Sequence, residues 1–195
     1  MKNEQMALLF SEATPYIQKY HGKTLVIKYG GNAMVNDDLK LAVMNDLVTL
    51  TLLGVRVVLV HGGGPEITAQ MVKAGKKTQF VGGLRVTDEE SVGITEMALV
   101  GKINTDLVGR LNRLGGKAVG LNGKDDNLIQ ARKHLADVYE NGEVNLVDIG
   151  YVGTVEHINT ELLNVLLDND FIPVIAPTGV GATGETYNIN ADSVA

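Results

Sequence analysis

The sequence contains no cysteine and no tryptophan, and only four histidines are scattered along its 195 residues. Without cysteine, the chain can form no disulfide bond, cysteine-bound zinc site, iron–sulfur cluster or thiol nucleophile. The separated histidines offer little to a metal ion. We therefore expect no metal site built from protein side chains.

Basic residues and long apolar runs are also scarce. Seventeen basic residues against 23 acidic ones give a net charge of −6, which disfavours nucleic acids and anionic membranes as partners. No run of about 18 apolar residues is available to span a bilayer. Charges interrupt the apolar stretch at the N-terminus, so it does not resemble a secretory signal. These features favour a cytoplasmic protein.

Glycine, by contrast, is in excess. It accounts for 23 of 195 residues, or about 12%, whereas average usage is about 7%. The rest of the composition, 45% hydrophobic and 21% charged, is typical of a globular domain. The places where glycine follows predicted strands are therefore the main guide to a binding site.

Strand-like and helix-like segments alternate along the chain. Runs rich in β-branched residues predict strands at 24–29 and 55–60, with a helix over 37–53 between them. Further helices are expected from Pro65, after Thr87 and over 160–167, and further strands over 117–121 and 171–175. This alternation predicts an α/β fold with a mainly parallel sheet.

Two of these helices carry more detailed expectations. The helix over 37–53 should begin at Asp37 or Asp38. Its predicted buried face consists of Leu39, Val43, Leu47, Leu50 and Leu53. The helix after Thr87 should open with a capping box, in which Thr87 and Glu90 each bond the other's backbone N–H.

Apolar residues at helical spacing predict an amphipathic helix over residues 1–20, which Pro15 should kink or break. That helix either covers the edge of its own domain or packs on another subunit, and the sequence alone does not choose. Segment 128–155, around the turn Asn141-Gly142, predicts antiparallel strands that project from the sheet. Segment 178–188 is expected to form a second hairpin or a loop.

Glycines follow both confident strands at their carboxyl ends, as Gly30-Gly31 and as Gly62-Gly63-Gly64. Ligands of open α/β sheets bind beyond these ends, where backbone N–H groups can approach an anion. Lys28 lies in the first strand, where an unpaired charge is costly and a ligand phosphate would be its partner. The alternatives are glycines that only allow tight turns and a lysine that extends into solvent.

Common phosphate-binding loops do not fit the sequence. In the segment that comes nearest to a P-loop, Glu185 occupies the position of the lysine. The same segment matches G-x-G-x-x-G, but a poor helix start follows it. His61 is expected to be structural, and no arrangement of Ser, His and Asp indicates a hydrolase.

Three further residues are candidates for ligand binding. The planar guanidinium of Arg85, between a glycine pair and a helix start, suits a carboxylate, although a surface ion pair is equally compatible with the pattern. Asn188 and Asn190 should point to the same side of an extended strand end, where their amides would bind a polar substrate. Asp192 follows and would orient lysines. The alternative is an ordinary turn with a capping residue.

Four motifs, taken together, resemble one family. They are Lys28-Tyr-Gly-Gly-Asn-Ala-Met34, His61-Gly-Gly-Gly-Pro65, Gly83-Leu-Arg-Val-Thr87 and Tyr187-Asn-Ile-Asn-Ala-Asp192. In this order, over essentially the whole chain, they resemble the amino acid kinase family and especially its members that phosphorylate N-acetyl-L-glutamate. The resemblance implies a three-layer α/β/α sandwich with a mainly parallel open sheet and protruding β-hairpins. It also implies ATP-dependent phosphorylation of the side-chain carboxylate of N-acetyl-L-glutamate, a step of arginine biosynthesis.

The resemblance assigns roles to individual residues. Lys28 would stabilise the transferring phosphoryl group, with Gly30 and Gly31 beside it, and Asp192 would organise the catalytic lysines. The substrate would be held by Gly63, Gly64, Arg85 and Asn188, with Arg85 on its α-carboxylate. ATP with Mg²⁺ would donate the phosphoryl group.

The family also implies a domain organisation. Its members continue beyond the motif that ends at Asp192 into a nucleotide-binding lobe with a second catalytic lysine, whereas this sequence ends three residues after Asp192. We expect residues 23–195 to be the amino-acid-binding lobe, inactive alone. Residues 1–22 resemble the N-terminal helix of arginine-inhibited members, which implies a dimer through the lobe, a hexamer through the helix and inhibition of the parent by L-arginine.

Two alternatives remain open from the sequence. One is another amino acid kinase, such as glutamate 5-kinase, which would use the same lysine and glycines on an unacetylated substrate. The other is an amino-acid-sensing module that binds its ligand without catalysis.

Overall fold

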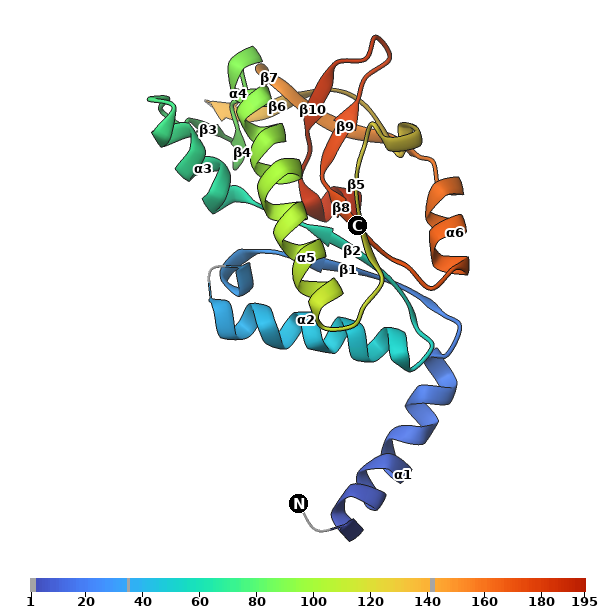
Figure 1. The fold of residues 1–195 in the computed structure, drawn as a ribbon. Coiled ribbons are helices and arrows are strands. Elements are labelled where there is room, and N and C mark those ends of the chain that lie inside the picture. The colour runs from blue at the N-terminus through green and yellow to red at the C-terminus, as the bar shows by residue number, and fades with distance from the viewer. Residues whose placement is uncertain (1–2, 35, 141–142) are drawn as a thin grey trace.

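A parallel sheet of four strands forms the centre of the computed structural model, which describes residues 3–34, 36–140 and 143–195. Helices cover one face of this sheet, and a helix and a second sheet cover the other (Figure 1). The strand order is β1 (Thr24–Tyr29), β2 (Arg56–His61), β8 (Ile172–Ala176) and β5 (Ala118–Asn122). The predicted α/β fold with a mainly parallel sheet is confirmed.

Alternation of side chains along β2 explains why this strand is central. Val57 and Leu59 join the core beneath the helices, whereas Val58 and Val60 join the core on the opposite face. Apolar residues at consecutive positions are typical of a parallel strand that is buried on both sides. β1 lies at the edge of the sheet, and Val26 is 50% exposed.

The helical layer contains one helix that is much longer than the others. Residues 89–113, called the long helix below, comprise α4 (Glu89–Glu96), the π-helical segment η2 (Met97–Asn104) and α5 (Thr105–Arg113). Beside it lie η1 (Gly31–Met34), α2 (Asp37–Leu52) and α3 (Gly64–Lys73). On the opposite face, α6 (Glu161–Asp168) packs against β8, and η3 (Asp125–Asn127) follows β5.

The predicted start of α2 is confirmed, since the helix begins at Asp37, but its predicted buried face needs correction. Asn36 precedes the helix as its N-cap, and its side chain accepts a hydrogen bond from the Leu39 N–H. The fully buried stripe is Met44, Leu47 and Val48, rotated by about one position from the predicted face. Val43 and Leu50 border that stripe, and Leu39 is half-exposed.

The predicted capping box at α4 is wrong. Asp88 is the N-cap, with its carboxylate accepting from the Ser91 N–H. The Thr87 hydroxyl instead donates to the Arg85 carbonyl at 2.9 Å. Thr87 is completely buried in a bridge to Gly150, so its side chain is not available to the helix N-terminus.

Both predicted hairpins form, but they pair with each other and not with the parallel sheet. β6 (Ile129–Glu140) and β7 (Glu143–Ile158) are antiparallel, as are β9 (Thr178–Val180) and β10 (Thr186–Asn188). The four strands close into a small barrel. The predicted turn Asn141-Gly142 lies outside the described residues. A further two-stranded hairpin joins β3 (Phe80–Val81) to β4 (Leu84–Arg85).

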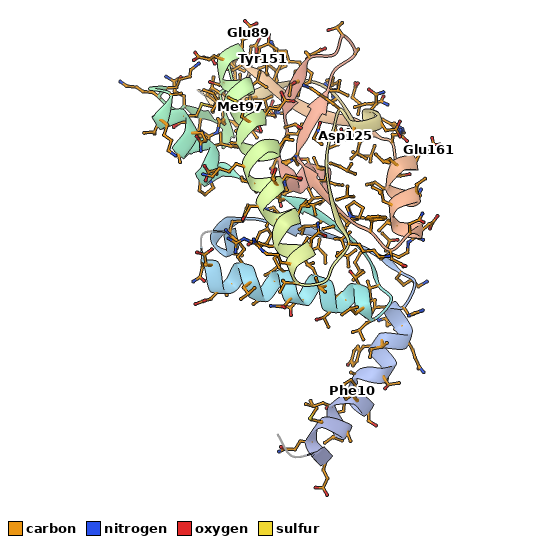
Figure 2. All side chains as sticks on the ribbon, viewed as in Figure 1. Phe10, Glu89, Met97, Asp125, Tyr151 and Glu161 are labelled. Atoms are coloured by element: carbon orange, nitrogen blue, oxygen red, sulfur yellow. The ribbon has the colours of Figure 1, made fainter. Side chains whose placement is uncertain are left out.

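The predicted N-terminal helix is present as α1 (Asn3–Tyr20), which extends away from the rest of the protein (Figure 1). It is not broken at Pro15, because proline removes one N–H donor while the neighbouring turns keep theirs. Phe10 lies on the projecting part of the helix and is 67% exposed (Figure 2). Among the described residues, no helix combines the length and apolarity that a membrane span needs.

Candidate functional site

A cavity of about 350 Å³ opens at the carboxyl ends of β1 and β2. The hairpin β3–β4, the start of α3 and the segment after β10 complete its wall. This is the position at which open α/β sheets bind their ligands. Seven of the eight residues predicted for the site line it, namely Lys28, Gly30, Gly31, Gly63, Gly64, Arg85 and Asn188.

The eighth residue, Asp192, reaches the cavity through Lys28. The Lys28 Nζ lies 3.0 Å from the Asp192 Oδ1, which joins β1 to the short helix α7 (Ala191–Val194). A Cβ at Gly30 would lie 3.2 Å from both Cε and Nζ of Lys28. The glycine therefore leaves room for the lysine to lie across the strand end. The prediction that Asp192 orients a lysine agrees with this contact.

The two glycine turns are tied to each other. The Gly62 N–H donates to the Tyr29 carbonyl at 2.8 Å, directly before Gly30. Gly31 has a φ of +65°, a conformation that favours glycine. At Gly63 a Cβ would lie 2.5 Å from Ile103 Cδ1 and 2.6 Å from Leu99 Cδ2, so no side chain fits there.

The first turn of α3 presents backbone N–H groups at this wall. Gly63 is the N-cap and has no side chain to accept from them, and Pro65 follows in the first turn, as predicted. A Cβ at Gly64 would meet nothing within 4 Å, so the backbone there borders open space. A helix N-terminus of this kind favours an anion.

Arg85 is buried beside this turn with part of its guanidinium unused. Its Nη2 donates to the Gly64 carbonyl at 3.2 Å and to the Thr68 hydroxyl at 2.8 Å. Its Nη1 is buried without a hydrogen-bond partner, and no ion pair of Arg85 occurs in the described part of the chain. The alternative of a surface ion pair is therefore wrong. Burial lowers the pKa of Arg85, and a ligand carboxylate would compensate the desolvated charge.

Asn188 lines the same cavity and is linked to Arg85 through one hydroxyl. Its Nδ2 lies 3.5 Å from the Thr87 Oγ1, and that hydroxyl donates to the Arg85 carbonyl. Asn190 lines the same cavity, as predicted for a residue two positions along an extended strand. Its Oδ1 also accepts from the Asp192 N–H at 3.1 Å, so it caps α7 as well.

Residues 23–195 match the amino acid kinase family. The chain belongs to that family. Acetylglutamate kinase of Moorella thermoacetica is 55% identical to it over 184 residues, covering 94% of this chain and 62% of the relative. Acetylglutamate kinase of Syntrophus aciditrophicus is 50% identical, covering 100% of this chain and 66% of the relative. The chain thus spans about two thirds or less of the length of these relatives.

Solved structures agree with an amino acid kinase fold. The N-acetylglutamate synthase of Neisseria gonorrhoeae, in a complex with coenzyme A and N-acetyl-glutamate, superposes with a TM-score of 0.75 at 28% identity. That match covers 93% of this chain and 40% of the synthase. Giardia carbamate kinase matches with a TM-score of 0.56 at 16% identity, covering 89% of this chain and 68% of the kinase, which indicates the shared fold.

Two residues at or next to this candidate site were missed by the sequence reasoning. Phe80 lines the cavity, and its ring centroid lies 4.8 Å from the Arg85 Cζ. Asn104, in the long helix, contacts the buried His61 next to the glycines. Neither side chain is charged or directly adjacent to a glycine in the sequence, so local spacing gave no signal for either.

The donor set of the site does not fit a metal ion held by the protein. Across the described ranges, no group of three or more histidine, aspartate or glutamate side chains converges. Asp192 is engaged by Lys28. Glu185, on the loop before β10, accepts hydrogen bonds from Thr183 and Tyr187, which hold the pKa of its carboxyl down to about 2. It therefore closes its own turn, in line with the rejection of a phosphate loop there.

Proposed function

We propose that this chain binds N-acetyl-L-glutamate and is part of an enzyme that phosphorylates the side-chain carboxylate of that acid with ATP. The observation that carries the proposal is the buried Arg85 with an unused Nη1, in the same cavity as Lys28 and both glycine turns. The names of the relatives at 50–55% identity support this substrate. The N-acetyl-glutamate bound by the synthase of related fold supports it as well.

The cavity offers a partner for each polar group of the substrate. We assign the α-carboxylate to the free Nη1 of Arg85, whose planar fork suits a carboxylate. The amide of Asn188, which lines the same cavity, suits the acetamido group. The side-chain carboxylate then extends toward Lys28, with the N–H groups at Gly63 and Gly64 along its path. An unacetylated α-ammonium would find a weaker match in a neutral amide.

The chemistry needs positioning and charge neutralisation but no general base. A glutamate side chain has a pKa of about 4.3 and is ionised at neutral pH, so its oxygen attacks directly. The new bond joins that oxygen to the γ-phosphorus of ATP, the bond from this phosphorus to the β,γ-bridging oxygen breaks, and ADP leaves. Lys28 and the N–H groups of Gly30 and Gly31 would stabilise the charge on the transferring group, with Asp192 holding Lys28 in place.

We further propose that the nucleotide is held largely by residues outside residues 23–195, because the relatives are about half as long again as this chain. The present residues would then contribute the acceptor site and the contacts to the transferring phosphoryl group. Mg²⁺ would come with the nucleotide phosphates, since the residues that the structure describes offer no cage of carboxylates for it. We derive no step through the metal.

Residues 1–22 are proposed to be an oligomerisation arm. The helix α1 exposes large apolar side chains along a projecting element, namely Met6, Leu8, Leu9, Phe10 and Tyr16. Exposed apolar surface of this kind marks a contact with another chain. We propose a dimer through the lobe, a hexamer of the parent through α1, and L-arginine as its inhibitor.

Isothermal titration calorimetry on the 195-residue chain tests the substrate. N-acetyl-L-glutamate should bind at least about 10-fold more tightly than L-glutamate, and Arg85→Gln should reduce the heat of N-acetyl-L-glutamate binding to that of a titration of the ligand into buffer alone. Arg132→Gln is the matched control, because Arg132 is an exposed hairpin arginine that pairs with Glu156. Tighter binding of L-glutamate would favour a glutamate kinase. A longer form of the protein, with the full length of the relatives, provides a second test. If it binds N-acetyl-L-glutamate but forms no product with ATP, a sensing module is favoured.

A further inference from the structure

The π-helical segment η2 lies directly against the triple-glycine turn. Leu99 and Ile103 of this segment occupy the space that a side chain at Gly63 would need. Both are buried, with exposures of 1% and 9%. Extended π-helical geometry is rare inside α-helices and is frequent at functional sites. Met97, labelled in Figure 2, begins the segment on the long helix and is 66% exposed.

Asn104 ends the π-helical segment and joins the long helix to two strands of the sheet. Its Nδ2 donates to the His61 Nε2 at 3.1 Å and to the Val174 carbonyl at 2.8 Å. A Cβ at Gly120 would lie 2.0 Å from the Asn104 Oδ1, so a glycine in β5 makes room for this side chain. The amide is 4% exposed, and water does not compete for these bonds.

His61 continues the chain of hydrogen bonds to the glycines. Because its Nε2 accepts from Asn104, its Nδ1 carries the proton and donates to the Gly62 carbonyl at 2.9 Å. The ring is fully buried, and desolvation lowers its pKa from 6.5 to about 4, which keeps it neutral at neutral pH. The tautomer required by both bonds is therefore maintained.

Both polar groups of Gly62 are consequently fixed. Its N–H donates to the Tyr29 carbonyl, and its carbonyl accepts from His61. The Gly62 carbonyl and the Gly63 N–H belong to one planar peptide and point in opposite directions. Holding the carbonyl toward the ring therefore turns the Gly63 N–H to the other side of the peptide.

We propose that Asn104 and His61 are positioning residues that set the orientation of the backbone N–H groups in the turn Gly62–Gly64. The inference rests on the proposed function in one respect only, namely that this turn binds the acid substrate. Neither side chain lines the cavity, so their effect is transmitted through the peptide of Gly62. A purely structural role would affect stability and leave the turn and the ligand affinity unchanged.

Asn104→Leu removes the donors while keeping the branched shape at Cγ, and Asn112→Leu, with the same change in volume, is its matched control. Asn112 also lies on the long helix and also bonds a strand, through Ala118 at the start of β5, away from the carboxyl ends. Both variants should lower the thermal unfolding temperature. Only Asn104→Leu should weaken binding of N-acetyl-L-glutamate by about 10-fold or more, in the calorimetric assay.

Two substitutions at His61 separate its two contacts. Asparagine places an amide N–H near the position of Nδ1 and can still donate to the Gly62 carbonyl, whereas glutamine places its amide near Nε2 and keeps only the contact with Asn104. His61→Asn should therefore retain more affinity than His61→Gln. The reverse order, or equal affinities, would overturn the proposal. This pair also carries the test if Asn104→Leu does not fold.

A measurement without ligand keeps this inference separate from the proposed function. In ¹⁵N-glycine-labelled protein, the amide resonances of Gly62, Gly63 and Gly64 should shift or broaden in Asn104→Leu and remain unchanged in Asn112→Leu. If the unaltered chain does not bind N-acetyl-L-glutamate, the proposed function fails. The glycine resonances still test the positioning role of Asn104 and His61 in that case. Unchanged glycine resonances in Asn104→Leu would refute that role.

Discussion

The Lys28 ammonium lies 3.0 Å from the Asp192 carboxylate, so an ion pair joins the first strand of the sheet to the last helix of the described chain. The lysine side chain is 35% exposed and the aspartate side chain 63%. Exposed pairs contribute only about 0–1 kcal/mol to stability. The contact is therefore better understood as a means of orienting the lysine at the cavity than as a source of stability.

Breaking this ion pair should reduce turnover and spare the fold. In the enzyme that carries this chain, we expect Asp192→Asn to lower kcat for acyl phosphate formation by about 10-fold or more, with a smaller change in KM for N-acetyl-L-glutamate. Hydroxamate trapping of the product measures kcat. Asp168→Asn is the control, since it breaks the Arg56–Asp168 pair, which has similar exposure and lies elsewhere. Equal kcat values for the two variants would contradict the assignment.

Two adjacent glycines should respond differently to a methyl group. Gly63→Ala places a Cβ against Leu99 and Ile103, and overpacking of this kind should lower the free energy of unfolding by about 1–3 kcal/mol. Gly64→Ala meets nothing within 4 Å at the start of a helix, and we expect a change below about 0.5 kcal/mol. Urea denaturation of both variants measures the difference. A larger loss at Gly64 would show that the packing around the turn differs from this description.

The ring of Phe80 should contribute to ligand affinity through Arg85. Its centroid lies 4.8 Å from the guanidinium carbon, within the range of a cation–π contact. Phe80→Leu keeps an apolar side chain but removes the π face, so the Kd for N-acetyl-L-glutamate should rise by about 2- to 5-fold, equivalent to about 0.5–1 kcal/mol. Tyr139→Leu, on an exposed aromatic of β6, should leave the Kd unchanged. Calorimetry on the three proteins distinguishes these outcomes.

His61 should make stability depend on pH in a defined window. Burial lowers its pKa from 6.5 to about 4, so between these values the unfolded chain binds more protons than the folded one. The contribution of His61 to the free energy of unfolding is complete above about pH 6.5 and is lost as the pH falls toward 4. Its size is about 3 kcal/mol. Below pH 4 both states are protonated, and no further loss comes from this residue.

The comparison of the unaltered chain with His61→Gln isolates that contribution from the carboxylates that titrate at lower pH, such as Asp88 with a pKa of about 2. We expect the unfolding free energy of His61→Gln to vary less between pH 6.5 and 4 than that of the unaltered chain. Parallel pH profiles for the two proteins would contradict the prediction, because they would mean that folding does not lower the pKa of His61.

The exposed apolar face of α1 predicts self-association. Phe10→Asp should lower the mass of the oligomer measured by analytical ultracentrifugation, because a charge would be buried in the contact. Tyr139→Asp alters another highly exposed aromatic, on β6, and should leave the mass unchanged. An oligomer of the same mass in Phe10→Asp would remove the role assigned to this helix.

Much of the fold was predictable because it depends on local chemistry. Strands such as β2 are marked by consecutive apolar residues, and Gly30 and Gly62 mark the points at which strands end. The buried face of α2 was less accessible to sequence reasoning, since its rotation depends on packing against the long helix and the sheet. Thr87 was assigned to a capping box although a distant residue, Gly150, engages its backbone.

The candidate site was predictable to a similar degree. Lys28 and Arg85 were found because a charge beside glycines is unusual, and the structure brings them to one cavity. Phe80 and Asn104 carry no comparable local signal. Their importance depends on contacts with residues on other elements, and Asn104 reaches Val174 across 70 positions of the chain. Such pairings become visible only when the tertiary structure is known.

The hydrogen bond from the Gly62 N–H to the Tyr29 carbonyl has a consequence for how this protein can evolve. Because main-chain atoms connect the two glycine turns, the spacing between the proposed phosphoryl side and the proposed amino-acid side does not depend on the side chains of Arg85 and Asn188. Under the proposed function, substitutions at Arg85 or Asn188 would then change which acid is accepted while the transfer distance is preserved. A scaffold of this kind allows new specificities to arise without rebuilding the step that all of them share.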